Sequence, residues 1–407
     1  MANEDVIVLE IGTGTVRALA GKVLDDGEVL ISGIGEAPSR GVRKGEIVNR
    51  DDVIGCVREA LSELETNGRS VVQSVVLATS GGETRGKIGR GAVRLVEPGI
   101  NQKTQVTETD VEEAMANARK TALSENRIRL HTLKRCFELD DVAKVDDPIG
   151  MTGEELRAEM LLLHGKRSAV ENLRKLVEDV PVTCSDAVFS GMCSGLAVAN
   201  SEQRRSGVLT IDLGEGTTDY ALFFDDALQA AGSLPVGGAH VTSDVAAALK
   251  IPLLQAERIK CKEASAVINL LERERTIPIP AESGFSGKVV RSVTLNVVTN
   301  ARMEEIFMLV KERIDAEVPD VPLVAGVLLT GGGAFLNGVR DLGEKVFNAP
   351  CFFGKPFGVK GLPSGKTSMT YAVAVGCIRY VDSLAERRTR PAWTERLLRW
   401  LKGGGHG

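Results

Sequence analysis

The stretch VLTIDLGEGTTDY, residues 208–220, combines residue types and spacing that suit a phosphate site. The apolar run Val208–Ile211 predicts a strand, and a second apolar run follows Gly214 and Gly216. The pattern predicts a hairpin whose turn has little side-chain bulk, so backbone N–H groups can approach an anion. Asp212, at the end of the first strand, could hold a hydrated divalent cation. The alternative is an ordinary hairpin with a glycine-rich turn.

A second hairpin of the same design opens the chain. Val6–Ile11 predicts a strand, GTGT follows at residues 12–15, and another apolar run comes next. Glu10 stands where Asp212 stands in the other copy. Two copies about 200 residues apart indicate two halves of similar structure, and a ligand clamped between the turns would explain both. Arg17 could reach a phosphate or could be a solvated strand arginine.

A third turn of this kind follows the apolar run Val324–Leu329, where the chain reads TGGGA from Thr330. Three glycines after a buried strand predict another close approach to a ligand. The segment GLPSGKT, residues 361–367, is not a P-loop, because only three residues separate its first glycine from the Gly-Lys pair.

Composition and periodicity indicate a globular chain of several compact units. The 407 residues exceed one ordinary core, and the net charge of −5 gives no bulk signature of nucleic-acid binding. A change in composition at both ends predicts an inserted α+β subdomain over Glu83–Leu163. A helix rich in small residues is predicted over Ser185–Asn200. Other helices are predicted over Asp52–Glu65, Ala169–Val180, Val241–Leu249, Leu254–Ala264 and Ala301–Arg313.

The C-terminal end predicts a separate amphipathic helix, Trp393–Lys402, after a charged linker. Its apolar arc holds Trp393, Leu397, Leu398, Trp400 and Leu401, and the opposite arc includes Arg396, Arg399 and Lys402. The helix would be ~15 Å long, half the ~30 Å hydrocarbon thickness of a bilayer. We therefore expect it to lie in the interface of an anionic membrane. Docking on its own domain or on a partner is the alternative.

Three segments resemble the actin/Hsp70 superfamily: EIGTGTVRALAG at 10–21, DLGEGTTD at 212–219 and LLTGGGAFLNG at 328–338. Within it, five segments resemble the FtsA family of bacterial cell-division proteins: SRGVRKGEIVN at 39–49, VTETDVEEAM at 106–115, DDPIGMTGEELRAE at 146–159, PVGGAHVTSDVA at 235–246 and NARMEEIF at 300–307. The resemblance extends from Val6 to about Leu384, and the tail is similar to the family's membrane-targeting helix.

The resemblance implies an α/β, actin-like fold with two lobes around a cleft for ATP and Mg²⁺, an inserted α+β subdomain and a C-terminal amphipathic helix. The implied divisions are 1–82 with 164–205 (subdomain 1A), 83–163 (inserted subdomain 1C), 206–234 with 315–383 (subdomain 2A), 235–314 (subdomain 2B), a linker at 384–392 and the helix at 393–402.

The resemblance also implies roles for individual residues. The β- and γ-phosphates would meet Gly12, Thr13, Gly14 and Arg17 from one lobe, and Gly214, Glu215, Gly216, Thr217 and Thr218 from the other. Asp212 would hold Mg²⁺ through water, with Glu10 as a further metal candidate. Glu257 and Lys260 would reach the ribose or adenine, and Gly331, Gly332 and Gly333 would face the adenosine.

Two of these residues depart from the superfamily's pattern. Glu10 replaces the usual aspartate and is one methylene longer, which would loosen metal geometry. Glu215 replaces the usual second glycine of its turn. Its carboxylate is tolerable if it faces the water shell of a metal, whereas facing the phosphates directly it would repel them.

The family's partner is the tubulin-like division protein FtsZ, whose C-terminal tail would dock on the subdomain that contains NARMEEIF. Arg302 and Glu305 are the candidates for this contact, and an intrahelical i,i+3 pair is the alternative. Asp186 is a candidate for orienting the attacking water, or else the N-cap of its predicted helix. At most weak ATPase activity is expected.

The implied function is polymerisation on the cytoplasmic side of the cell membrane, at the division site, where the peripheral protein would tether FtsZ filaments. The implied partners are the FtsZ tail, further copies of this chain, anionic lipid and other divisome proteins, with no nucleic acid. Two alternatives share the superfold. One is a pilus-assembly ATP-binding protein, which would lack the amphipathic tail, and the other is a sugar kinase, for which the sequence offers no convincing base.

Overall fold

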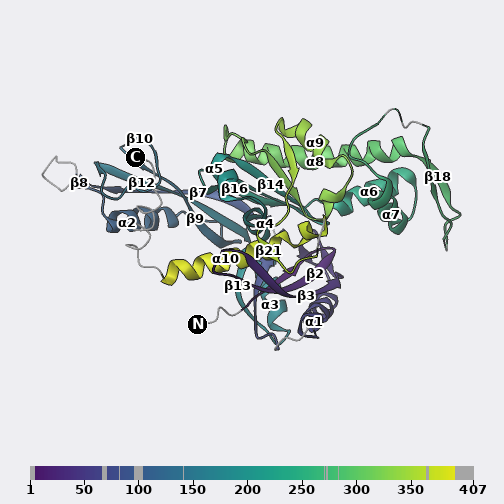
Figure 1. Ribbon diagram of the computed structural model, residues 1–407, viewed down its shortest axis with the longest axis horizontal. Helices are drawn as coiled ribbons and strands as arrows, with labels where there is room; N and C mark the ends of the chain where they lie inside the picture. Colours follow the sequence, from purple (N-terminus) through teal and green to yellow (C-terminus); the bar gives the residue numbers. More distant parts are fainter. Residues whose placement is uncertain are drawn as a thin grey trace.

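The computed structural model describes residues 5–66, 71–81, 83–95, 104–140, 142–269, 271, 274–282, 284–363 and 366–389. Two sheets form the centres of two lobes, and a third sheet extends from one side (Figure 1). The two-lobed α/β architecture with an inserted subdomain confirms the predicted fold class. Among the described helices, none combines the length and apolar character needed to cross a bilayer.

The sheet of the first lobe has six strands, in the order β13-β6-β1-β2-β3-β21. These strands span Thr183–Phe189 (β13), Ser74–Thr79 (β6), Val6–Ile11 (β1), Thr15–Val23 (β2), Val29–Pro38 (β3) and Val359–Lys360 (β21). β1 pairs antiparallel with β2 and parallel with β6, so β1 and β6 end at the same edge of the sheet. Helices α1 (Arg50–Thr66) and α3 (Arg167–Glu178) share a hydrophobic core with one face.

The sheet of the second lobe has the order β16-β15-β14-β19-β20. Its strands span Ala227–Leu234 (β16), Thr218–Phe224 (β15), Val208–Leu213 (β14), Val327–Thr330 (β19) and Cys351–Phe353 (β20). Alternate residues face opposite sides, because successive side chains of a strand point in opposite directions. Leu209 and Ile211 pack toward α8 (Ser292–Glu317) and α9 (Val339–Phe347), whereas Val208 packs on the other face.

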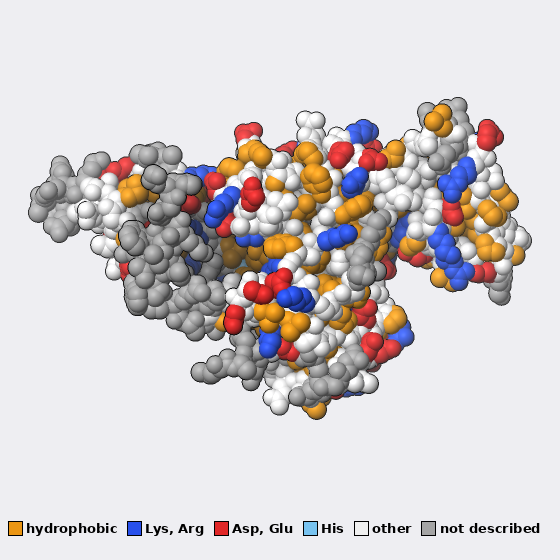
Figure 2. Space-filling model, viewed as in Figure 1, with side chains coloured by type: hydrophobic (Ala, Val, Ile, Leu, Met, Phe, Trp, Pro, Cys, Tyr) orange, Lys and Arg blue, Asp and Glu red, His pale blue; other side chains and the backbone are white. Residues whose placement is uncertain are grey.

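Beyond this sheet lie α6 (Gly238–Leu249), α7 (Leu253–Glu263) and the hairpin of β17 (Thr276–Ile279) and β18 (Lys288–Arg291). They form the right-hand end of the molecule in Figure 1. Figure 2 shows hydrophobic side chains at this end, among charged groups of both signs.

Two helices, α4 (Ser190–Val198) and α10 (Ala372–Thr389), form a layer shared by both lobes. Their core contains Val8 and Val76 from one sheet together with Val208 and Ala221 from the other. The helices pack backbone against backbone, because a Cβ added at Gly376 would overlap the carbonyl oxygen of Cys193. This shared layer therefore fixes how the two lobes face each other.

The inserted subdomain contains a sheet in the order β10-β9-β12-β7. Its main strands span Arg85–Arg94 (β7), Arg127–Leu139 (β9), Val142–Val145 (β10) and Glu155–Lys166 (β12). Helix α2 (Glu108–Arg119) packs on β7 and β12 and begins with a capping box between Thr107 and Asp110. A short pair, β8 (Thr104–Gln105) with β11 (Thr152–Gly153), completes the subdomain.

Two expectations about secondary structure are wrong. The helix predicted over Ser185–Asn200 begins only at Ser190, because the preceding residues form β13 alongside β6. The predicted linker at 384–392 is helical as far as Thr389, where α10 ends. The predicted amphipathic helix, Trp393–Lys402, lies outside the described residues.

A matched pair of substitutions tests the close packing of α4 on α10. Gly376→Ala is expected to lower the free energy of unfolding by at least about 1–3 kcal/mol, because the helix backbones must separate. Gly55→Ala, at an exposed position of α1 with open space around it, is expected to raise it by about 0.5–1 kcal/mol. Urea titrations measure both values. Equal effects of the two substitutions would contradict the packing described.

Candidate functional site

Two glycine turns of the same build face each other across a cavity of about 180 Å³. In the β1–β2 turn, the N–H of Gly12 donates to the carbonyl of Thr15 at 3.1 Å. In the β14–β15 turn, the N–H of Gly214 donates to the carbonyl of Thr217 at 3.0 Å. The internal repeat predicted from the sequence is therefore present, with one copy in each lobe.

The turns approach so closely that side chains are excluded at two positions. A Cβ at Gly216 would overlap Oγ1 of Thr13, and a Cβ at Gly14 would overlap Oε2 of Glu215. At Gly216 a Cβ would also meet the Cβ of Thr13 and the backbone of Lys44, so glycine keeps the lobes close there, whereas at Gly14 the neighbour is the movable end of the Glu215 side chain. The result is a narrow space bordered by backbone, which suits an anion.

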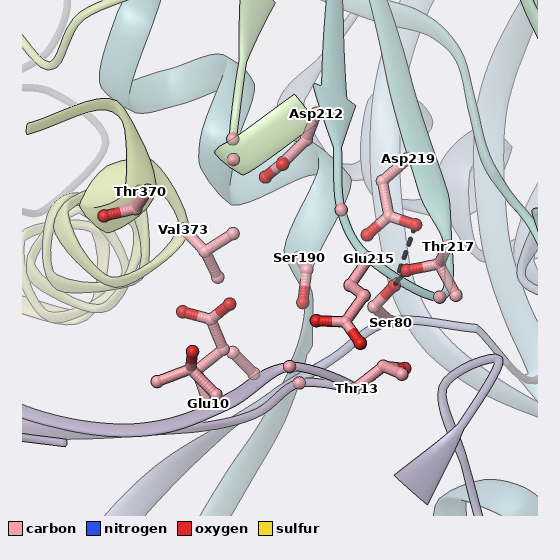
Figure 3. A pocket seen from close by; sticks show the side chains of 18 of the residues that line it. Glu10, Thr13, Ser80, Ser190, Asp212, Glu215, Thr217, Asp219, Thr370 and Val373 are labelled. Carbon is pink, nitrogen blue, oxygen red and sulfur yellow. Dashed lines mark hydrogen bonds between the residues drawn. The ribbon is translucent and has the colours of Figure 1, made fainter. Parts of the chain in front are cut away.

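Ser80, which follows β6, links the two lobes beside this space. Its hydroxyl donates to Oδ1 of Asp219 at 2.8 Å and lies 2.8 Å from Oγ1 of Thr217 (Figure 3). Ser233 also donates to Oδ1 of Asp219, at 2.6 Å. Asp219 is thus held by two hydroxyl donors at the back of the cleft.

Four carboxylates line the cavity, and burial is the largest effect on the pKa of each. The pKa of Asp212 is raised well above its usual value, and that of Asp219 is raised to about 7. Burial also raises the pKa of Glu10 and that of Glu215. Desolvation disfavours the charged form of a carboxyl group, so this site favours either protonation or a cation.

Among the described residues that line this cavity, Arg17 alone carries a permanent positive charge. Its guanidinium lies 2.7 Å from Glu36 and 3.6 Å from Glu10, and it stacks near the ring of Tyr371. The sequence could not show Glu36 as a partner, because that residue comes from β3. Arg17 therefore already neutralises part of the acidic surplus.

Two buried polar atoms in the cavity have no hydrogen-bond partner in the described structure: Oε2 of Glu10 and the hydroxyl of Ser190. Figure 3 shows Glu10, Asp212 and Ser190 directed into the same space. A buried polar group without a partner costs about 1–3 kcal/mol, so such atoms commonly mark a place that water or a ligand fills.

The residues present fit a hydrated Mg²⁺ better than a metal cage. The described residues contain no group of three His, Cys, Asp or Glu side chains arranged to hold a metal. Mg²⁺ usually keeps several waters and takes one or two carboxylates together with phosphate oxygens. Asp212 and Glu10, which face one another across the cavity, could supply those carboxylates.

A second cavity of about 300 Å³ adjoins the first and shares Gly214, Glu215 and Gly332 with it. Apolar side chains dominate its wall: Leu213, Val241, Met303, Ile306, Phe335 and Leu336. At its polar side, Nζ of Lys260 donates to Glu257 at 2.7 Å and to the carbonyl of Gly238 at 3.2 Å. The pair of cavities suits a ligand with a flat apolar group at one end and an anionic chain at the other.

The structure brings most of the predicted residues together. The first cavity is lined by Glu10, Gly12, Thr13, Gly14, Arg17, Asp212, Gly214, Glu215, Gly216, Thr217, Gly331 and Gly332. The second is lined by Glu257, Lys260 and Gly333 among others. Thr218 lines neither, because its buried hydroxyl donates to the carbonyl of Val236.

Asp186 also lies outside both cavities, exposed on β13, and it does not begin a helix. Ser190 occupies the helix start instead. Arg302, on α8, donates to Asp244 at 2.6 Å and to Glu305 at 2.6 Å. The intrahelical pair is therefore present, with Asp244 as an additional partner for the guanidinium.

Eight residues that line the first cavity are not among the predicted site residues: Ile11, Thr15, Ala78, Ser80, Ser190, Asp219, Thr370 and Val373. Ser80 carried a usable signal, because it ends a strand parallel to β1 and is followed by two glycines. Asp219 lies within the DLGEGTTD segment, opposite Asp212 in the hairpin register. Ser190 was missed because the helix was predicted to begin at Ser185, which placed Ser190 inside the helix and not at its start.

The pKa of Asp219 gives a testable pH dependence. Burial raises the pKa of Asp219 to about 7, so in the folded chain this carboxyl keeps its proton far above the ordinary aspartate pKa of 3.8. Stability should therefore fall as pH rises through this window, because the unfolded chain ionises first. Asp219→Asn keeps an oxygen that can accept from both hydroxyl donors but has no proton to lose. It should therefore reduce the fall in the free energy of unfolding between pH 5 and 8 by on the order of 2 kcal/mol.

Urea unfolding at several pH values measures this difference. Asp225→Asn, at the exposed turn between β15 and β16, is the matched control and should leave the slope unchanged. A slope for Asp219→Asn equal to that of the unsubstituted chain would contradict a neutral, buried Asp219.

Comparison with known proteins agrees with this geometry. Residues 209–376 match the family model described as "Cell division protein FtsA", and residues 82–164 match the model described as "SHS2 domain inserted in FTSA". The cell division protein FtsA of Escherichia coli strain K12 is 30% identical over 414 residues, covering 98% of this chain and 97% of that protein.

Solved structures share the fold at lower sequence identity. The PilM-PilN type IV pilus biogenesis complex contains a chain with a TM-score of 0.63 at 15% identity, covering 92% of this chain and 97% of that chain. MreB5 of Spiroplasma citri, solved bound to ADP, has a TM-score of 0.53 at 14% identity, covering 96% and 99%. Because the similarity to the E. coli protein extends over almost the whole length of this chain, the chain belongs to the FtsA family of bacterial cell-division proteins.

Proposed function

We propose that the chain binds ATP with Mg²⁺ in the cleft, polymerises on the cytoplasmic side of the cell membrane at the division site, and tethers FtsZ filaments there. The observation that best supports nucleotide binding is the pair of opposed glycine turns beside an apolar cavity. The ADP of the similarly folded MreB5 supports it. Membership of a cell-division family favours this role over pilus assembly or sugar phosphorylation.

The cleft residues divide into three groups by chemistry. Backbone N–H groups of the two glycine turns would hold the phosphates, and Asp212, with Glu10 nearby, would hold Mg²⁺ through water. The base would lie against Val241 and Met303, with Lys260 at the sugar. When bound, Mg²⁺ would offset the negative charge of the phosphates.

Weak ATP hydrolysis at most is expected. Orienting an attacking water requires a positioned acid or amide. Asp186 lies on the exposed side of β13 and is not proposed for this role. The hydroxyl of Ser190 faces the cavity but is a poor base. The cleft therefore suits binding that controls assembly better than rapid turnover.

Assembly and membrane attachment would use opposite parts of the molecule. Leu253, Leu254 and Val289 are each more than half exposed at the end formed by α7 and β18, and they offer apolar area to another copy. Helix α10 lines the cleft with Val373 in its first turn and leads to the basic, tryptophan-containing tail. That tail would bind anionic lipid.

The FtsZ tail would dock near Arg302 and Glu305 on α8. Glu305 is exposed, whereas the guanidinium of Arg302 is already engaged by Asp244. Glu305 is therefore the better single probe, and Glu312→Lys, two turns further along the same helix, is its control. Unchanged binding of an FtsZ tail peptide to Glu305→Lys would place the contact elsewhere.

Electron microscopy on anionic lipid monolayers tests the proposed function directly. With ATP and Mg²⁺, the full chain should form ordered filaments on the lipid. A chain that ends at Thr389 keeps the whole of α10 and should leave the lipid bare, because only the tail is removed. A full chain that leaves the monolayer bare, or a shortened chain that covers it equally, would contradict the proposal.

A further inference from the structure

Glu215 stands at the junction of the two cavities. Glu215 lines both cavities. The other two residues that line both are Gly214 and Gly332, which have no side chain. Glu215 is therefore the side chain that a ligand reaching from one cavity into the other must pass.

The carboxylate of Glu215 extends across the cleft to the opposite lobe. Its Oε2 lies so near Gly14 that a Cβ there would overlap it. Figure 3 shows the carboxylate between Thr13 and Ser190, within the space that separates the two turns. The side chain thus occupies part of the path between the apolar cavity and the backbone N–H groups.

The two turns differ at this position. The middle residue of the first turn is Thr13, whose hydroxyl is neutral and accepts from the N–H of Gly45 at 3.3 Å. The middle residue of the second turn is Glu215, an exposed residue with a carboxylate side chain, and Glu10 lines the same cavity. Anionic oxygens a few ångströms apart repel strongly in a partly desolvated site.

We propose that Glu215 makes the cleft selective for metal-bound nucleotides, because its carboxylate opposes a free polyphosphate and tolerates one whose charge a divalent cation has reduced. This inference rests on the proposed nucleotide binding. It assigns to one side chain a discrimination that the backbone N–H groups, which serve any phosphate, do not provide.

Two substitutions separate the charge of Glu215 from its size. Glu215→Gln keeps the shape and removes the charge, whereas Glu215→Gly removes both. Glu202→Gln removes one charge from the exposed helix α5 (Ser201–Ser206), outside both cavities, and is the matched control. Each variant is first checked for an unchanged urea-unfolding midpoint.

Isothermal titration of the full chain with ATP, once with Mg²⁺ and once with EDTA, gives the ratio of the two affinities. Glu215→Gln should bind metal-free ATP about tenfold more tightly than the unsubstituted chain, and its affinity with Mg²⁺ should change much less. Glu215→Gly should behave likewise, and Glu202→Gln should match the unsubstituted chain.

The outcomes are distinct. An unsubstituted chain that binds ATP with Mg²⁺ while Glu215→Gln keeps its affinity ratio overturns the inference and leaves nucleotide binding standing. Tighter binding of metal-free ATP by Glu215→Gly but not by Glu215→Gln also overturns the inference, because the size of the side chain and not its charge would then be responsible. An unsubstituted chain that binds ATP under neither condition overturns the proposed function and this inference with it.

Discussion

The close approach of two backbone turns is the constraint on which the rest of the structure depends. A side chain at Gly216 would overlap Thr13 of the opposite turn, and one at Gly14 would overlap the carboxylate of Glu215. Each turn ends a hairpin of its own sheet, so both sheets must present the same edge to the cleft. The shared layer of α4 and α10 sets that separation, and Gly376 allows the two helices to touch along their backbones.

The chemistry of the cleft follows from its acidic lining. Glu10 and Glu215 line this cleft, and the guanidinium of Arg17 is already engaged by Glu36, so a phosphate without a cation would be electrostatically unfavourable there. Under the proposed function, a divalent cation would resolve the conflict, and the buried, unpartnered oxygen of Glu10 would face its water shell. Under the proposed function, the nucleotide and the cation would bind in the cleft together.

The sequence allowed prediction of the hairpins, the glycine turns and the inserted subdomain, because these depend on local patterns. It misplaced the start of α4, since β13 ends in the apolar run Ala187–Phe189, which has no alternation and reads equally well as helix. The end of α10 was also missed, because Glu386, Arg387 and Arg388 are good helix formers as well as linker residues. Glu36, which pairs with Arg17, and Asp244, which pairs with Arg302, come from distant elements, so no local pattern could reveal these two partners.

A structure of the full chain with Mg²⁺ and a non-hydrolysable ATP analogue is the most direct test of the account. The account predicts the phosphates between the turns at Gly12–Gly14 and Gly214–Gly216, the metal beside Asp212, and the adenine against Val241 and Met303. A nucleotide bound elsewhere, or a cleft still empty at saturating analogue, would contradict it.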